Sequence, residues 1–157
     1  MIVAKFGGTS VADAAAIRRL IEIIRSRLSA QPVVVVSALA TVTDSLLALA
    51  LLVESGNGPA VDAAILALVG RHAETARGLA GTEAAMERIR RDAEALCREL
   101  TRMLGRRLSP AGLDALAGRG ELWSSQLIAA AMSGAGLDAA WVDIRPIMIT
   151  DDRFTRA

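Results

Sequence analysis

The start of the chain alternates between strand-like and helix-like patterns, and this alternation constrains the fold more than any other feature. Residues 2–6 form a short β-prone run that stops at Gly7-Gly8. Residues 13–28 then place isoleucine and leucine along one helix face, and Gln31-Pro32 ends that helix. Four consecutive valines, 33–36, follow, as expected of a strand buried on both faces. Strand, helix and strand within about 35 residues predict a βαβ unit.

The rest of the chain predicts further helices and one more strand. An apolar helical run follows the loop 37–44 and closes in a glycine-rich turn at residues 55–59. A short helix starts at Ser109-Pro110, and Gly118-Arg119-Gly120 is expected to interrupt before the next helix. The other helices are predicted over residues 60–79 and 82–104, as an antiparallel pair, and over residues 121–133. A third strand is predicted over residues 139–144.

These elements predict an α/β fold: an open, mostly parallel sheet of about three strands with helices on its faces. The sheet is expected to be incomplete at one edge. An unpaired strand edge beside apolar surface invites pairing with another copy of the chain. We therefore expect a homo-oligomer.

Composition and charge restrict the class of protein. The chain has 157 residues, the size of one domain, and is 53% hydrophobic but only 3% aromatic, which suits helices packed on an aliphatic sheet. Its 18 basic and 17 acidic residues are spread evenly, so we expect no nucleic-acid partner. One cysteine excludes an intramolecular disulfide, no Cys/His cluster has zinc-site spacing, and we predict a cytoplasmic protein with no bound metal of its own. The longest apolar stretch, residues 46–53, is far short of the ~20 residues of a membrane span.

Two loops at the carboxyl ends of predicted strands are candidate binding sites, because open α/β sheets bind ligands there. Lys5 with Gly7 and Gly8 could bind an anion through a positive charge and backbone N–H groups, including those of the following helix. A glycine turn with a solvated lysine explains the same residues equally well. The loop 37–44 offers hydroxyls and a carboxylate for a polar substrate, although Thr43 or Asp44 could instead cap the next helix.

Other polar and aromatic residues are weaker candidates. Glu121, expected in the first turn of a helix, could bind an ammonium group or could simply favour the helix dipole. His72 is expected on a solvated helix face and Cys97 as a small packed residue. Trp123 and Trp141 are predicted to contribute packing, so none of these last four is a predicted site residue.

Four segments carry a family resemblance. Lys5 to Val11 reads Lys-Phe-Gly-Gly-Thr-Ser-Val, and residues 33–38 form a hydrophobic strand ending in Ser-Ala, with Val-Thr-Asp following at 42–44. Gly-Glu-Leu at 120–122, with a serine at 124, and the segment from Asp143 to Phe154 complete the set. In this order they resemble the motifs of aspartate kinases, in the amino-acid kinase superfamily. The resemblance implies that residues 1–157 form the N-terminal lobe of that fold, the amino-acid-binding part of the catalytic domain.

The resemblance also implies an activity and residue roles. The reaction would be transfer of the γ-phosphoryl group of ATP, carrying Mg²⁺, to the β-carboxylate of L-aspartate, a step of lysine and threonine biosynthesis. Lys5 would be catalytic and would contact the ATP phosphates together with Gly7, Gly8, Thr9 and Ser10. The aspartate would be bound by Ser37, Thr43 and Glu121, with Glu121 facing the α-ammonium group.

Some features depart from the family pattern. The family usually has glycine near Thr41 and asparagine where this chain has Asp44. The later family segment Gly-Arg-Gly-Gly-Ser-Asp, which supplies an arginine and a catalytic aspartate, does not occur. We therefore expect a fragment of an aspartate kinase, inactive by itself. The alternatives are a non-catalytic amino-acid-binding or subunit-assembly protein, and a kinase for another amino acid, which the Thr-Ser-Val after the glycines disfavours.

Overall fold

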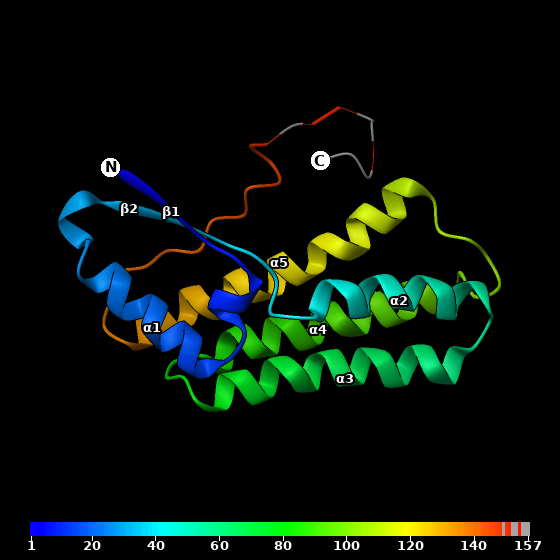
Figure 1. Cartoon of the computed structure of the whole chain (residues 1–157). Helices are drawn as coiled ribbons and strands as arrows, with labels where there is room; N and C mark the ends of the chain where they lie inside the picture. The colour runs from blue at the N-terminus through cyan, green and yellow to red at the C-terminus, as the bar shows by residue number, and fades with distance from the viewer. Residues whose placement is uncertain (149, 152–153, 155–157) are drawn as a thin grey trace.

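The computed structural model describes residues 1–148, 150–151 and 154, and it begins with the βαβ unit that the sequence predicts. Strands β1 (Ile2–Phe6) and β2 (Pro32–Val36) pair in parallel, with Ile2 opposite Pro32 and Phe6 opposite Val36. The crossover contains the 3₁₀ turn η1 (Gly8–Val11), helix α1 (Ala14–Arg25) and the 3₁₀ turn η2 (Leu28–Ala30) (Figure 1). The α/β assignment is confirmed.

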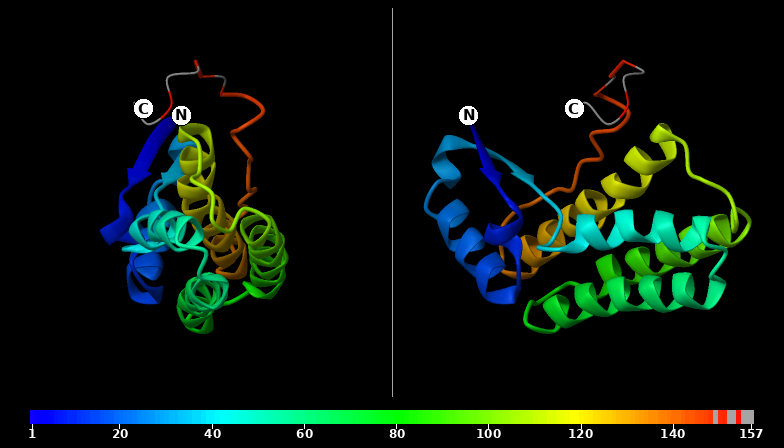
Figure 2. Two further views of the ribbon diagram at one scale, coloured as in Figure 1. Left: turned by 90° about the vertical axis from the view of Figure 1, so that its right-hand side faces the viewer. Right: turned by 45° about the vertical axis from the view of Figure 1, so that its right-hand side comes forward.

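Four long helices form the bulk of the molecule: α2 (Val42–Glu54), α3 (Gly58–Arg77), α4 (Glu83–Thr101) and α5 (Pro110–Gly134). Helices α3 and α4 form the predicted antiparallel pair, and α2 packs against both α3 and α5 (Figures 1 and 2). The caps follow simple rules, since Asn57 and Ser109 each accept a backbone N–H of the first turn and a proline lies just inside each helix. A single apolar core joins all five helices to the inner face of the sheet.

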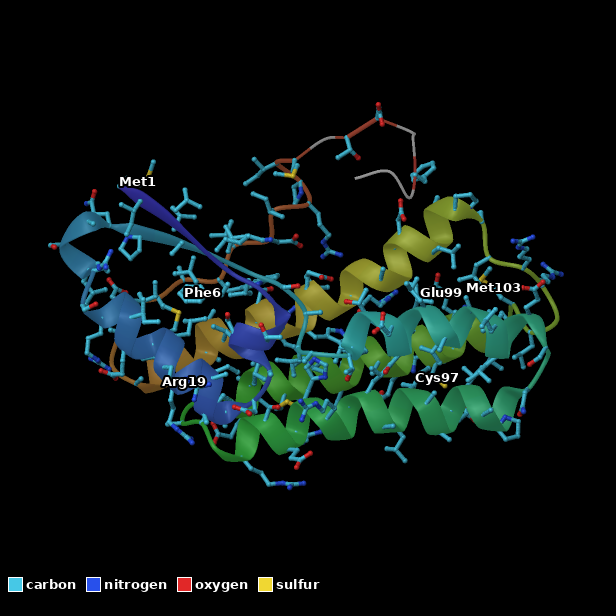
Figure 3. All side chains as sticks on the ribbon, in the orientation of Figure 1. Met1, Phe6, Arg19, Cys97, Glu99 and Met103 are labelled. Carbon is cyan, nitrogen blue, oxygen red and sulfur yellow. The ribbon has the colours of Figure 1, made fainter. Side chains whose placement is uncertain are left out.

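The two faces of the sheet differ sharply. Phe6, at the end of β1, packs on the core with the other inward residues (Figure 3). On the outer face Val3, Val33 and Val35 remain 69%, 47% and 44% exposed. The prediction that residues 33–36 are buried on both faces is therefore wrong, because no helix of the described chain covers the outer side. Within the described residues, no helix is both long and apolar enough to cross a membrane.

The third predicted strand is absent from the part of the chain that the structure describes. Residues 139–144 follow α5 as irregular backbone on the side of the molecule opposite α3 (Figure 2). Their β-prone composition indicates that these residues would fit a half-buried pleated surface, but composition alone does not form a strand. They pair with neither strand in the described chain, so the sheet there has two strands instead of the predicted three.

The predicted break at Gly118-Arg119-Gly120 is also wrong, since α5 runs unbroken through it. Gly120 is buried, and a Cβ atom built there would lie 2.8 Å from Ala38 Cβ and 3.2 Å from Val42 Cγ1. The glycine therefore serves the close approach of α5 to α2 and its preceding loop. Packing outweighs the helix-propensity cost of glycine, about 1 kcal/mol relative to alanine.

Candidate functional site

Three of the predicted segments meet at the carboxyl ends of β1 and β2. Ser37 N–H donates to the Phe6 carbonyl at 3.1 Å, which continues the strand pairing by one residue. A Cβ atom on Gly8 would lie 3.2 Å from the Ala38 carbonyl oxygen, so the loops after the two strands are in contact. The middle of α5 contacts the same loop, through Gly120, Glu121 and Ser124. This is where an open parallel sheet places its ligand.

The glycine loop is a tight turn with one open side. Gly7 is extended, with φ −75° and ψ 172°, and its carbonyl accepts the N–H of Ser10 at 2.9 Å. A Cβ atom at Gly7 would meet no heavy atom within 4 Å, whereas Gly8 lies against the second loop. Thr9 and Ser10 are exposed, and Lys5 lies on the outward face of β1. A ligand can therefore reach this loop from the open side of the sheet.

At the start of α1, one of the N–H groups that the sequence prediction assigned to a ligand is taken by a side-chain cap. The Asp13 carboxylate accepts the N–H of Ala16 at 2.8 Å and caps the helix. That hydrogen bond lowers the pKa of Asp13. The short turn η1 directly follows Gly7, and no side chain caps its start.

The loop from Ser37 to Thr41 is held by α5. The N–H of Ala38 donates to Glu121 Oε1 at 3.4 Å, and the Ser124 hydroxyl donates to the Ser37 carbonyl at 2.8 Å. Glu121 lies in the middle of α5 and not in a first turn, so the helix-dipole explanation for it is wrong. The structure thus brings the Ser37–Ala38 peptide next to Glu121.

Helix α2 begins without a side-chain cap. Its N-cap residue is Thr41, whose side chain accepts no N–H of the helix, and Thr43 and Asp44 lie in the first turn. The cap interpretation of Thr43 and Asp44 is therefore wrong. Thr41 has φ 71° and ψ −8°, a left-handed conformation that is unfavourable for a β-branched residue. This is the position near which the family usually has glycine.

His72 is not on a solvated face, as expected from its charged neighbours, but completely buried. Its ring meets the Trp123 ring edge to face, with centroids 5.4 Å apart, and its Nδ1 lies 2.8 Å from the Leu68 carbonyl. Burial lowers the pKa of His72. Among the described residues, His72 Nε2 is a buried side-chain nitrogen without a hydrogen-bond partner. The prediction failed because α3 is covered on this side by its neighbours, which the local sequence does not reveal.

A polar cluster within the helices escaped the sequence prediction. Arg119 Nη1 donates to both oxygens of Asp92, at 2.7 and 2.8 Å, and Trp123 Nε1 donates to Asp92 Oδ2 at 2.7 Å. Glu99 accepts a further bond from Arg119 at 3.2 Å. A clue to this cluster was the arginine between two glycines, where an apolar helix would otherwise continue.

The remaining candidates behave mostly as predicted. Cys97 Sγ donates to Asp62 at 3.0 Å, and this hydrogen bond raises the pKa of the thiol, consistent with its exclusion as a nucleophile. Trp123 is buried and packs as predicted, whereas Trp141 is partly exposed and donates to the Ser125 hydroxyl. In the fourth motif, Arg145 pairs with Asp143 and lowers the pKa of that carboxyl. Residues 149 and 152–153 of that motif lie outside the described residues.

The architecture defines an α/β protein whose polar loops gather at the carboxyl ends of parallel strands, a class that binds small ligands there. A sequence model of the amino acid kinase family matches residues 1–156. The chain therefore belongs to the amino acid kinase family.

Within this family, the individual relatives to which the chain is similar include aspartokinases. The chain is 34% identical to the lysine-sensitive aspartokinase 3 of Escherichia coli (strain K12) over 167 residues, covering 100% of this chain and 34% of that protein. It is 33% identical to a chloroplastic bifunctional aspartokinase/homoserine dehydrogenase 2 of Arabidopsis thaliana, covering 94% of this chain and 16% of that protein. The chain thus spans about a third of the bacterial relative and about a sixth of the plant relative.

Solved structures of an aspartokinase are also similar to this chain. A structure of E. coli aspartokinase III in complex with aspartate and ADP matches with a TM-score of 0.81 at 34% identity, over 98% of this chain and 33% of that one. A structure of the same enzyme with lysine and aspartate matches with a TM-score of 0.84 at 32% identity, again over 98% of this chain and 34% of the other. The fold is therefore that of the corresponding third of aspartokinase.

Proposed function

We propose that this chain forms the aspartate-binding and phosphate-loop part of an aspartate kinase. The reaction transfers the γ-phosphoryl group of ATP to the β-carboxylate of L-aspartate and forms 4-phospho-L-aspartate. The observation that carries the proposal is the convergence of the β1 loop, the β2 loop and Glu121, in a chain similar over its whole length to aspartokinases. The chain spans about a third of its bacterial relative, so the activity of a whole aspartokinase is proposed for residues 1–157 only in this partial role.

Lys5 and the glycine loop are proposed to hold the ATP phosphates. The Lys5 ammonium would offset charge on the transferring group, and Gly7, Gly8, Thr9 and Ser10 would donate backbone or hydroxyl hydrogen bonds. The open side of Gly7 and the exposure of Thr9 and Ser10 support this assignment. Mg²⁺ is proposed to arrive on the ATP, because it is commonly held through phosphates and one or two carboxylates.

Ser37, Thr43 and Glu121 are proposed to bind L-aspartate. Glu121 uses one oxygen for the Ala38 N–H, which leaves the other available for the α-ammonium group of the substrate. Ser37 follows β2 directly, and Thr43 lies on the first turn of α2, at the far end of the same loop. Catalysis then depends on positioning and electrostatic stabilisation, without a covalent nucleophile.

A ligand titration tests this proposal on the chain itself. The ¹H–¹⁵N NMR spectrum should change at Ala38 on addition of L-aspartate and at Gly7 and Gly8 on addition of Mg-ATP. Glu121→Gln should weaken aspartate binding about tenfold or more, since a buried ammonium loses its charged partner. Glu83→Gln, at an exposed position of α4, is the matched control and should bind like the unmodified chain.

The outcomes separate three hypotheses. Aspartate binding without glutamate binding supports an aspartate kinase, and the reverse preference would support a kinase for another amino acid. Binding of aspartate without any response to Mg-ATP would favour the non-catalytic amino-acid-binding alternative. No response to either ligand at millimolar concentration would contradict the proposed site in this chain.

We also propose that the exposed outer face and edges of the sheet make contact with another copy of the chain. Parallel sheets are usually covered on both faces, and here Val3, Val33 and Val35 form an uncovered apolar row. Sedimentation should show a dimer or larger assembly that Val35→Lys dissociates; a monodisperse monomer would contradict the assembly. The cytoplasmic location also stays a proposal, since the plant relatives are chloroplastic by name.

A further inference from the structure

One peptide group in the candidate site is held on both sides by α5. It is the peptide that joins Ser37 to Ala38, directly after β2. Its carbonyl accepts the Ser124 hydroxyl at 2.8 Å, and its N–H donates to Glu121 Oε1 at 3.4 Å. Gly120, one residue earlier on α5, has no side chain to hold the loop away, since even a Cβ atom would lie 2.8 Å from Ala38 Cβ. These three positions of α5 form a clamp on the Ser37–Ala38 peptide.

The Ser124 hydroxyl has two possible acceptors, and geometry favours the loop. It lies 2.8 Å from the Ser37 carbonyl and 3.1 Å from the Glu121 carbonyl in its own helix, and it carries one hydrogen. Ser124 is fully buried, so no water competes for that hydrogen. Its neighbour Ser125 provides a contrast, because that hydroxyl donates within the helix, to the Leu122 carbonyl at 3.0 Å.

The clamp also reaches the glycine loop. The carbonyl of Ala38, the next one along the chain, lies where it would be only 3.2 Å from a Cβ atom on Gly8. A rotation of the Ser37–Ala38 peptide would move Ala38 and the backbone that carries the Ser37 side chain. The orientation of this one peptide therefore links the proposed aspartate loop to the proposed phosphate loop.

We infer that Ser124 is a positioning residue, which fixes the Ser37–Ala38 peptide in the orientation that substrate binding requires. Its hydroxyl does not contact the ligand. Its hydrogen bond to the Ser37 carbonyl favours the observed orientation of the peptide over the flipped one, while Glu121 accepts the Ala38 N–H on the opposite side. The functional consequence rests on the proposed aspartate site, whereas the peptide orientation can be measured without any ligand.

The structural test uses NMR of the ¹³C,¹⁵N-labelled chain. Ser124→Ala should shift the Ser37 carbonyl ¹³C resonance upfield, because that carbonyl loses its donor, and should speed amide exchange at Ala38 about tenfold. Ser125→Ala, with a hydroxyl removed from the adjacent position, should change neither signal. Ser124→Thr keeps the hydroxyl and should restore both. If Ser124→Ala fails to fold, Ser124→Cys replaces it, since a thiol is a weaker donor and should give the same changes in smaller size.

The functional test measures the dissociation constant for L-aspartate in the same variants. Positioning predicts that Ser124→Ala raises it about tenfold, with Ser125→Ala unchanged and Ser124→Thr restored. A purely structural serine would lower the midpoint of urea unfolding but leave the affinity of the folded chain unchanged, and that result would overturn the inference. So would unchanged Ser37 and Ala38 signals in Ser124→Ala. If the unmodified chain itself does not bind aspartate, the proposed function fails, and the carbonyl and amide signals still decide whether Ser124 orients the peptide.

Discussion

The helical bundle and the sheet end of this molecule differ in how much apolar surface they bury and in the strain of their backbone. In the bundle, Asp92 satisfies both Arg119 and Trp123, and the apolar side chains around them are buried. At the sheet end, the outer valines are exposed and Thr41 holds an unfavourable backbone conformation beside the candidate site. The difference indicates that stability resides mainly in the helices. The loops after the strands are the part adapted to a ligand or partner.

Removing the Trp123 side chain tests most directly whether the helical bundle carries most of the stability. Trp123→Ala should lower the free energy of unfolding by about 3–5 kcal/mol, because a large buried side chain is removed and Asp92 loses a donor. Urea unfolding followed by circular dichroism measures the change. Trp141→Ala is the control, since Trp141 is partly exposed and should cost far less. Equal losses in the two variants would contradict the central role of the bundle.

The parts of the fold that could be predicted from the sequence are those with local sequence signals. The βαβ unit was predictable because its signals are local, namely helical periodicity, a terminating proline and a run of valines. The unbroken α5 was not, because Gly120 is explained by its contact with Ala38, 82 positions earlier in the chain. The third strand was predicted from composition, but a strand also needs a neighbour to pair with.

In the candidate site, too, residues with local sequence signals could be predicted, whereas contacts between distant segments could not. Lys5, the glycines and Ser37 could be found because they lie at the carboxyl ends of predicted strands, whereas Glu121 was a weaker candidate until the family resemblance implied its role. The contacts of Glu121 and Ser124 with residues 37–38 join segments more than 80 positions apart. Nothing local to either segment encodes that contact, nor the burial of His72 among charged neighbours.

Acidification offers a milder test of the bundle, through His72. Burial lowers its pKa in the folded state, so the unfolded chain binds a proton first, near its ordinary value of about 6.5. Stability is therefore intact above pH 6.5 and is lost as the pH falls from there toward the lower pKa of the folded state. The expected slope in that window is at most about 1.4 kcal/mol per pH unit, the value for a difference of one bound proton. Urea unfolding measured at steps from pH 7.5 to 5 gives this slope.

The control for acidification is His72→Phe, which keeps a ring against Trp123 but has no proton to bind. This histidine is the only one in the chain, so the variant should show a smaller slope than the unmodified chain between pH 6.5 and 5. An unchanged slope would assign the effect to other groups. A slope that depends on His72 concerns the stability of the bundle, because His72 lies in α3 and the loops after the strands contain no histidine.

The smallest expected effect is a gain of stability at the sheet end. Thr41→Gly should raise the free energy of unfolding by about 0.5–1 kcal/mol. A left-handed conformation costs a non-glycine residue about 1–2 kcal/mol, and glycine returns part of that through its freer unfolded chain. Thr43→Gly, in the first turn of α2, should instead lose a few tenths of a kcal/mol, because glycine is less favourable than threonine in a helix. A loss of stability in both variants would show that the Thr41 conformation carries no strain. A gain in Thr41→Gly together with weaker aspartate binding would show that the strain is retained for the site.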